Sequence, residues 1–238
     1  MKPTKNVYID LGAGSLDEQK TNYFYEYVKN DFSENKKIVC VEANDIHIDD
    51  IKSRFQDFND LIVYNLAIVD DKKINKVKLF YCTKDAPDYQ VSSLDIEHVK
   101  KHYPNEQILS KSVSCMEINT FLENFKKYNI EYLKLDIEGV DEKILTSINF
   151  KMFTIKNISI EKLHLEQRFK TIYFLLKNFY FPNYKINELS RFDSFFSKKD
   201  RNIKNTFKFL KFLIYLILER IFFRIWNMAY KYIRKYEI

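Results

Sequence analysis

The fold of this chain is decided by the stretch VYIDLGAG at residues 7–14, and LKLDIEG at residues 133–139 follows a similar plan. In each stretch an apolar run typical of a buried strand leads into acidic residues and glycine. The two stretches hold all three glycines of the 238-residue chain. Glycine is needed where the backbone turns with positive φ or lets a ligand approach closely. The stretches therefore indicate the carboxyl ends of two strands, where open α/β sheets bind ligands.

Strand-like and helix-like stretches alternate through most of the chain, which predicts an α/β fold. We expect a mostly parallel, seven-stranded sheet with helices on both faces. The periodicity predicts strands at 6–11, 37–41, 61–68, 131–135 and 157–163, an extra strand at 76–81, and an antiparallel pair at 184–189 and 192–196. It predicts helices at 15–30, 45–58, 119–128, 140–148 and 166–179. The polar residues 82–112 are interpreted as an active-site loop region.

The positive charge of the chain is concentrated in its last segment. Residues 201–238 hold nine of the 39 Lys and Arg residues and two of the 33 Asp and Glu residues, so they carry +7 and residues 1–200 carry −1. A neutral body argues against a general nucleic-acid-binding face. We therefore divide the chain into a catalytic domain at 1–200 and a basic amphipathic tail at 201–238.

Residues 206–234 of the tail are predicted to form one long helix. Its longest uncharged run, 212–218, has seven residues, far fewer than the roughly 20 that span a bilayer. A basic amphipathic helix suits a membrane surface, and the alternative is that its apolar stripe packs on the body or on a second copy of the chain. The stripe consists of Leu210, Ile214, Leu218, Ile221, Ile225, Met228 and Tyr232.

The cysteine pattern and the first strand bear on the compartment. Cys40, Cys82 and Cys115 form no C-x-x-C pair, so neither a zinc site nor a disulfide framework is suggested. The first expected strand begins at residue 6, which leaves no room for a signal peptide. We expect a cytoplasmic protein that the tail brings to the inner face of the membrane.

The first glycine turn has the form D-x-G-x-G. As a dinucleotide fingerprint it would need a small third residue where Asp17 stands, and no Gly-Lys-Ser/Thr follows to form a phosphate loop. S-adenosylmethionine has no pyrophosphate, so its methionyl carboxylate and ribose suit a turn with only Gly12 and Gly14. Glu42 ends the next strand and is predicted to accept hydrogen bonds from the ribose hydroxyls. A purely structural turn and a solvated Glu42 are the alternatives.

The second stretch extends to KLDIEGVD at residues 134–141, followed by IL at 144–145, and resembles the K-x-D-x-E-G-x-E…L signature of FkbM-type methyltransferases. Further pieces agree in order at 10–14, 41–42, 65–67, 92–94, 119–122 and 158–161. The resemblance covers roughly residues 6–165 and implies a Rossmann-like class I methyltransferase fold. It also implies S-adenosylmethionine-dependent O-methylation, commonly of sugars or secondary metabolites. The cofactor-binding residues are then expected to be Asp10, Gly12, Ala13, Gly14, Glu42, Asn65, Ala67 and Asp136.

Four side chains are candidates for the chemistry of methyl transfer to a hydroxyl group, which loses a proton and is helped by a base. Asp136 ends a strand beside the first glycine turn and is the first candidate, with Glu138 two residues on and facing the same side of an extended segment. Glu161 and His164 end the next strand and are candidates for base or acceptor binding. The structural alternatives are a helix cap for Asp136, a turn-shaping role for Glu138 and a packing role for His164.

No metal ligands are assigned, although several carboxylates with one histidine can alternatively hold a divalent cation. His98 and His102 are interpreted as loop histidines, because no third ligand lies near them in the sequence. The sequence thus predicts an O-methyltransferase that acts on a sugar, a glycan precursor or a related hydroxylated metabolite. The alternatives are an NAD(P)-linked oxidoreductase and a non-catalytic, membrane-associated Rossmann-like module. The expected partners are a small-molecule or glycan acceptor, the membrane surface and a second copy of the chain.

Overall fold

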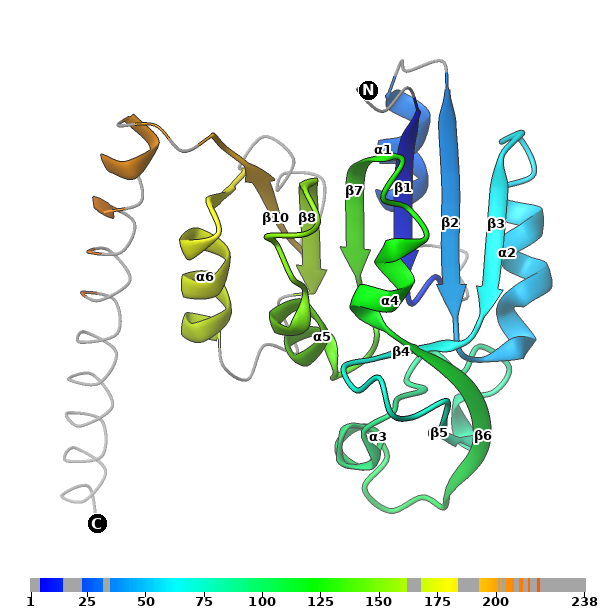
Figure 1. Ribbon diagram of the computed structural model, residues 1–238. Coiled ribbons are helices and arrows are strands. Elements are labelled where there is room, and N and C mark those ends of the chain that lie inside the picture. The colour runs from blue at the N-terminus through cyan, green and yellow to red at the C-terminus, as the bar shows by residue number, and fades with distance from the viewer. Residues whose placement is uncertain are drawn as a thin grey trace, which may run out of the picture.

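The centre of the molecule is a seven-stranded sheet of order β3-β2-β1-β7-β8-β10-β9 (Figure 1). A computed structural model describes residues 5–14, 23–31, 35–161, 168–183 and 193–200, and residues 202, 204–207, 210, 211, 214 and 218 of the tail. The five strands from β3 to β8 are parallel, and β10 runs antiparallel to both of its neighbours. The strands are β1 (Asn6–Leu11), β2 (Lys36–Glu42), β3 (Leu61–Asn65), β7 (Asn129–Leu135), β8 (Ile155–Glu161), β9 (Tyr180–Pro182) and β10 (Asp193–Lys198). The predicted α/β fold with a mostly parallel, seven-stranded sheet is confirmed.

Helices cover both faces of this sheet, as predicted (Figure 1). Successive side chains of a strand point to opposite faces, so Val7, Ile9 and Leu11 of β1 enter one core cluster and Tyr8 enters the other. The first cluster includes residues of α4, α5 and α6, and the second includes residues of α1 and α2. These helices are α1 (Tyr23–Asn30), α2 (Ile48–Arg54), α4 (Ile118–Glu123), α5 (Asp141–Ser147) and α6 (Arg168–Lys177).

The strand order reverses direction between β1 and β7, which makes this the switch point of the sheet. The chain passes from β1 outward through β2 to β3, and later returns to pair β7 with the other side of β1. Leu11 at the end of β1 pairs with Val41 of β2 and with Leu135 of β7. Open α/β sheets bind ligands outside the carboxyl ends of the strands at such a point.

A smaller layer lies beyond the carboxyl ends of the parallel strands (Figure 1). It contains a three-stranded sheet of order β4-β6-β5 and a short helix. These elements are β4 (Ala67–Val69), β5 (Lys76–Cys82), α3 (Ile96–His102) and β6 (Ile108–Glu117). The extra strand expected at 76–81 is confirmed as β5. The interpretation of 82–112 as loop was wrong for α3 and for the start of β6. In β6, exposed serines alternate with half-buried side chains, and residues 108–114 pair with all seven residues of the antiparallel strand β5.

Several predicted boundaries differ from the observed ones. The strand expected at 61–68 is two strands, because the chain leaves the main sheet after Asn65 and enters the small sheet at Ala67. The antiparallel pair at the end of the sheet is formed by β9 and β10, whereas the strand expected at 184–189 lies outside the described residues. The first half of the helix expected at 15–30 and most of 206–234 also lie outside them. The described residues from 204 onward are helical.

Candidate active site

The first glycine turn joins three strand ends through its backbone. Gly12 has a φ of +82°, and the amides of Gly12 and Ala13 both donate to the carbonyl oxygen of Val41, at 2.9 and 3.1 Å. A Cβ on Gly12 would collide with the carbonyl oxygen of Asp136 and lie 2.6 Å from its carbonyl carbon. The amide of Asp136 in turn donates to the carbonyl oxygen of Leu11, at 3.0 Å. Glycine is required here because the loop after β7 touches the turn after β1.

Glu42 is fixed against this turn. Its Oε2 accepts from the amide of Gly14 at 2.9 Å, and its Oε1 accepts from the amide of Asn44 at 2.7 Å. Burial raises the pKa of Glu42, and the two backbone amides act in the opposite direction. Each carboxylate oxygen keeps a second lone pair for a ligand hydroxyl. The structure therefore brings Gly14 and Glu42 together, as the expected ribose site requires.

Among the residues that the structure describes, none fills the space beside Gly14. A Cβ built on Gly14 would meet no atom closer than the carbonyl oxygen of Gly12, at 3.9 Å, although its φ is +41°. A conformation that glycine favours, next to open space and a fixed carboxylate, suits close approach of a ligand to the backbone. This turn and the hydrogen-bonding groups around it fit the ribose and methionyl parts of S-adenosylmethionine.

Arg54 is a member of this site that the sequence did not reveal. Its Nη1 donates to the carbonyl oxygen of Ala13 at 3.0 Å, and its Nη2 donates to that of Gly14 at 2.9 Å. The planar guanidinium presents parallel donors that suit two neighbouring acceptors. Arg54 was placed inside a predicted helix and given no role. The signal that would have found it is its rarity, because it is the one arginine among the first 167 residues.

Asn65 and Ala67, the remaining residues expected to bind cofactor, lie behind the end of β2. The side-chain amide of Asn65 donates to the carbonyl oxygens of Glu42 and Ala43, at 3.0 and 3.3 Å. Ala67 is buried in β4. Asn65 thus binds the backbone carbonyl groups of Glu42 and Ala43. It contributes to the site indirectly, by fixing the backbone that carries the Glu42 side chain.

Asp10 lies beneath the site and is linked to it by a lysine. The side chain of Asp10 is fully buried, and its Oδ1 lies 3.3 Å from Nζ of Lys134. The same Nζ lies 2.9 Å from Oδ2 of Asp136. Burial raises the pKa of Asp10 to about 6, and the charge of Lys134 opposes that rise. Asp10 has no exposed surface, so Lys134 links it to the site, and the burial does not support the direct contact with the cofactor that was expected.

Three acidic side chains converge where β7 and β8 end. Asp136, Glu138 and Glu161 are all half-buried, and each offers a carboxylate oxygen within 4.8 Å of the other two. All three were expected at the acceptor side, and the structure brings them together. Oxygen atoms in this arrangement can accept hydrogen bonds from hydroxyl groups or coordinate a divalent cation. His164, the fourth candidate, lies outside the described residues.

The small layer supplies two further contacts to Glu138. His98 Nε2 lies 3.0 Å from Oε2 of Glu138, and the hydroxyl of Ser93 donates to the carbonyl oxygen of Glu138. The interpretation of His98 as a loop histidine was wrong, because it is a buried residue of α3. The contact joins residues 40 positions apart, so spacing in the sequence gave no signal of it.

Asp141, the first residue of α5, fixes the loop that precedes this helix. Its Oδ1 accepts from the amide of Ile137 at 2.9 Å, and its Oδ2 is buried without a hydrogen bond. Burial raises the pKa of Asp141 to about 7, and the nearby charge of Asp136 adds to the rise. The carboxyl of Asp136 remains 31 % exposed. Asp141 thus shapes the loop and leaves Asp136 available to a ligand.

Replacing Asp141 with asparagine is expected to flatten the pH dependence of stability. The folded pKa of about 7 exceeds the reference value of 3.8, so the folded state binds more protons and the free energy of unfolding falls as pH rises from about 4 to about 7. Asparagine keeps an acceptor for Ile137 and has no proton to lose. Urea unfolding at several pH values should show the variant gaining a few kcal/mol relative to wild type across this window, at about 1.4 kcal/mol per pKa unit.

A suitable control for this measurement is the variant Asp49→Asn. Asp49 has a side chain that is 98 % exposed, so this variant removes a carboxyl group without changing the interior of the protein. The gain in stability between pH 4 and pH 7 should be clearly larger for Asp141→Asn than for this control. Equal changes in the two variants would contradict the burial of an ionisable Asp141.

The switch-point sheet, the D-x-G-x-G turn and the acid at the end of the next strand define a Rossmann-like methyltransferase. Residues 10–200 match the family described as the methyltransferase FkbM domain, and the chain belongs to this family. No curated protein matches the sequence. The family resemblance and the methyltransferase class expected from the sequence are therefore confirmed. S-adenosylmethionine is the usual cofactor of such enzymes.

Proposed function

We propose that the protein transfers a methyl group from S-adenosylmethionine to a hydroxyl group of a sugar, a glycan precursor or a related hydroxylated metabolite. The observation that carries the proposal is the junction at Gly12. On one side of it, Gly14 and Glu42 form a site suited to ribose. On the other side, Asp136 touches Gly12 through its backbone and presents a carboxylate. A cofactor on the turn would thus face the acidic cluster with its reactive end.

Different residues of the site have different roles in this reaction. Bound S-adenosylmethionine supplies an electrophilic methyl group, whose bond to sulfur breaks as the acceptor oxygen forms its new bond to carbon. Asp136 accepts the proton that the acceptor hydroxyl loses, and Lys134 holds this carboxylate in place from 2.9 Å. Glu138 and Glu161 accept hydrogen bonds from neighbouring hydroxyls of the acceptor. Several carboxylates in one place suit a polyhydroxylated molecule, which supports a sugar or glycan precursor as the acceptor.

Isothermal titration with S-adenosylmethionine and with its demethylated product tests the cofactor assignment. Binding of both, without binding of NAD(P), is the expected result. Absence of binding at millimolar cofactor would reject the proposal. The acceptor class is tested by incubating the protein and methyl-labelled S-adenosylmethionine with the glycan fraction of cells that lack the protein. Label and one additional CH₂ should then appear in that fraction, whereas a non-catalytic module would bind cofactor and transfer nothing.

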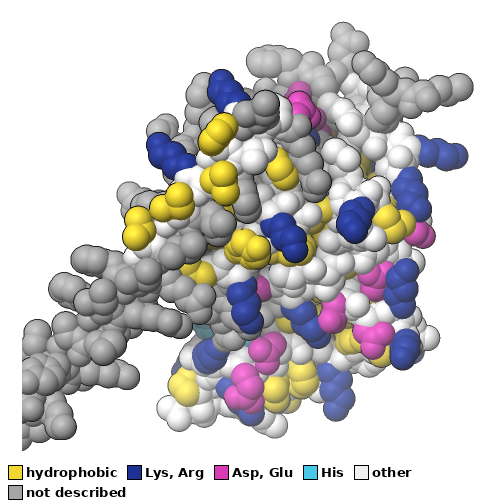
Figure 2. All heavy atoms as spheres, turned by 60° about the vertical axis from the view of Figure 1, so that its left-hand side comes forward, with side chains coloured by type: hydrophobic (Ala, Val, Ile, Leu, Met, Phe, Trp, Pro, Cys, Tyr) yellow, Lys and Arg dark blue, Asp and Glu magenta, His cyan; other side chains and the backbone are white. Residues whose placement is uncertain are grey.

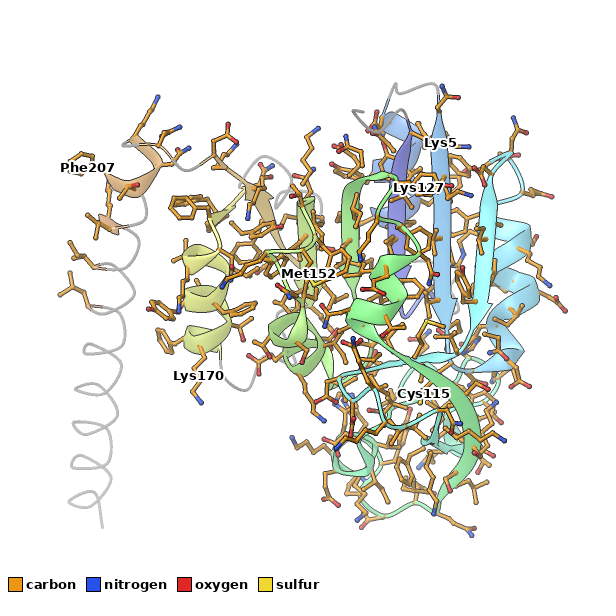
Figure 3. The ribbon with its side chains drawn as sticks, viewed as in Figure 1. Lys5, Cys115, Lys127, Met152, Lys170 and Phe207 are labelled. Carbon is orange, nitrogen blue, oxygen red and sulfur yellow. The ribbon has the colours of Figure 1, made fainter. Side chains whose placement is uncertain are left out.

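We also propose that the tail helix holds the enzyme at an anionic membrane surface. Phe207, Leu210, Ile214 and Leu218 are 66, 45, 58 and 59 % exposed, and their spacing of three or four residues places them on one side of a helix. Phe207 points away from the body (Figure 3). Figure 2, in which this side of the molecule comes forward, shows several hydrophobic side chains at the surface. This exposure supports an external partner rather than packing of these residues on the body.

No helix in the described part of the chain combines the length and apolar character that crossing a bilayer requires. A surface-bound helix would instead bury one apolar side in the headgroup region and leave its lysines near anionic lipids. Lys204 and Lys211, which lie in the same segment as these apolar residues, are exposed. The proposed location is the cytoplasmic face of a membrane, where glycan precursors on lipid carriers would be accessible.

The double variant Ile214→Gln/Leu218→Gln should lose most of its binding to phosphatidylglycerol-containing vesicles. Each such side chain contributes about 1.5 kcal/mol or more when buried, so the partition coefficient in co-sedimentation should fall about 100-fold. The matched control is Ile74→Gln/Met152→Gln, which removes two side chains that are 40 and 50 % exposed elsewhere on the body. Unchanged vesicle binding of the tail variant, together with loss of a dimer in light scattering, would favour a second copy of the chain as the partner.

A further inference from the structure

The loop after β7, which carries Asp136 and Glu138 of the acidic cluster, is bound from outside the main sheet. Its residue Glu138 is held at two points by the small layer, through its carbonyl oxygen by Ser93 and through its carboxylate by His98. Ser93 and His98 are both buried. The position of the Glu138 carboxylate is therefore set by residues that come from a different part of the chain, 40 or more positions away.

The backbone of the loop is shaped around the imidazole of His98. Glu138 has a φ of +47° and Gly139 a φ of +89°. Residues other than glycine rarely adopt a positive φ. A Cβ on Gly139 would lie 2.7 Å from Nδ1 and 2.8 Å from Cγ of His98. The glycine of the D-x-E-G motif is thus needed so that the ring can pack against the loop. Strained backbone of this kind persists only where the surroundings enforce it, and it clusters at functional sites.

The ring and the carboxylate differ in their access to a ligand. The side chain of His98 is 7 % exposed and that of Glu138 is 24 % exposed. The Nδ1 edge of the ring faces Gly139, and Nε2 faces Glu138. A substrate therefore reaches the carboxylate and not the imidazole. Because a carboxylate only accepts hydrogen bonds, Nε2 carries the hydrogen and donates to Oε2 of Glu138.

We propose that His98 is a positioning residue for methyl transfer, which acts by fixing the carboxylate of Glu138 among the acidic side chains of the site. The hydrogen bond from His98 fixes Oε2, and the side chain of Glu138 is 24 % exposed, so an acceptor hydroxyl can approach the carboxylate. This bond acts against the repulsion from Asp136 and Glu161, whose oxygens lie within 4.8 Å. This inference rests on the proposed function, because the carboxylate is assigned to the acceptor side.

Two substitutions of His98 test this role. His98→Gln keeps an N–H donor near Nε2, whereas His98→Leu keeps bulk and removes the donor. In the assay with methyl-labelled S-adenosylmethionine and glycan fraction, we expect the Leu variant to be slowed 10- to 100-fold and the Gln variant to be within about fivefold of wild type. The KM for S-adenosylmethionine should change less than threefold in both variants. The control is His102→Leu, an exposed residue one helical turn on, 5.0 Å from His98 between ring centroids, which should keep the wild-type rate.

A double-mutant cycle with Glu138→Gln separates positioning from a general structural effect. If His98 acts through Glu138, adding His98→Leu to Glu138→Gln should cause less than a twofold further loss of rate. If the rate losses of the two single variants multiply in the double variant, or if His98→Leu is as fast as wild type, the inference is overturned and the proposed function stays intact. If His98→Leu does not fold, His98→Gln and the double-mutant cycle built on it decide the question. A rate of His98→Gln as low as that of Glu138→Gln would then overturn the inference. Absence of transfer by the wild type would overturn the proposed function and this inference together.

Discussion

Replacing Asp136 with asparagine is expected to slow methyl transfer by about 10²–10⁴-fold, the usual contribution of a positioned acid or base. Asparagine has nearly the same size but does not accept the proton that the acceptor hydroxyl loses. Glu42 and the glycine turn remain in place, so the affinity for S-adenosylmethionine should change less than about threefold. The rate is measured as label transferred into the glycan fraction, and the affinity by isothermal titration.

Asp70 provides a matched control for this substitution. Its carboxyl is 30 % exposed and lies 2.9 Å from Nζ of Lys143, whereas that of Asp136 is 31 % exposed and lies 2.9 Å from Nζ of Lys134. The two variants thus remove the same charge from the same kind of pair, once outside the acidic cluster and once inside it. Asp70→Asn should keep the wild-type rate. A wild-type rate for Asp136→Asn would refute the role assigned to that carboxylate.

The central sheet was predictable because its determinants are local. Apolar β-branched runs mark the buried parallel strands, and rare glycines mark the turns that follow β1 and β7. The small layer was less predictable. Ser110, Ser112 and Ser114 of β6 are exposed and lie between half-buried residues, and α3 is a helix of only seven residues. The start of β6 is held by its pairing with β5, which its own polar sequence does not indicate.

The candidate site was also predictable only in part. Glu42 and Asp136 were found because they end strands, and parallel strands bring their ends to one edge. Arg54, Lys134 and His98 were given no role, since each acts on a partner that only the folded chain brings near. Lys134 illustrates this limit: it stands inside the recognised motif, yet its place between Asp10 and Asp136 follows from the pairing of β1 with β7.

Replacing Gly12 with alanine is expected to destabilise the protein more than any other single methyl addition at the site. The new Cβ would lie 2.6 Å from the carbonyl carbon of Asp136 and collide with its oxygen, so backbone must move. Overpacking of this kind costs typically about 1–3 kcal/mol or more, and the positive φ costs roughly 1–2 kcal/mol besides. At about 2–4 °C per kcal/mol, the thermal midpoint in calorimetry should fall by roughly 5–20 °C.

Gly14→Ala separates the collision from the backbone conformation, because Gly14 also has positive φ, whereas its Cβ would meet no atom of the described residues closer than 3.9 Å. This variant should lose only the conformational part of the stability, and its added methyl group would occupy the space assigned to the cofactor. At roughly 1–2 kcal/mol for the positive φ and about 2–4 °C per kcal/mol, we expect its midpoint to fall by only about 2–8 °C, while its affinity for S-adenosylmethionine falls about tenfold or more. Equal midpoints for the two variants would show that the turn after β1 does not press against the loop after β7. The shared edge on which the catalytic assignment depends would then be lost.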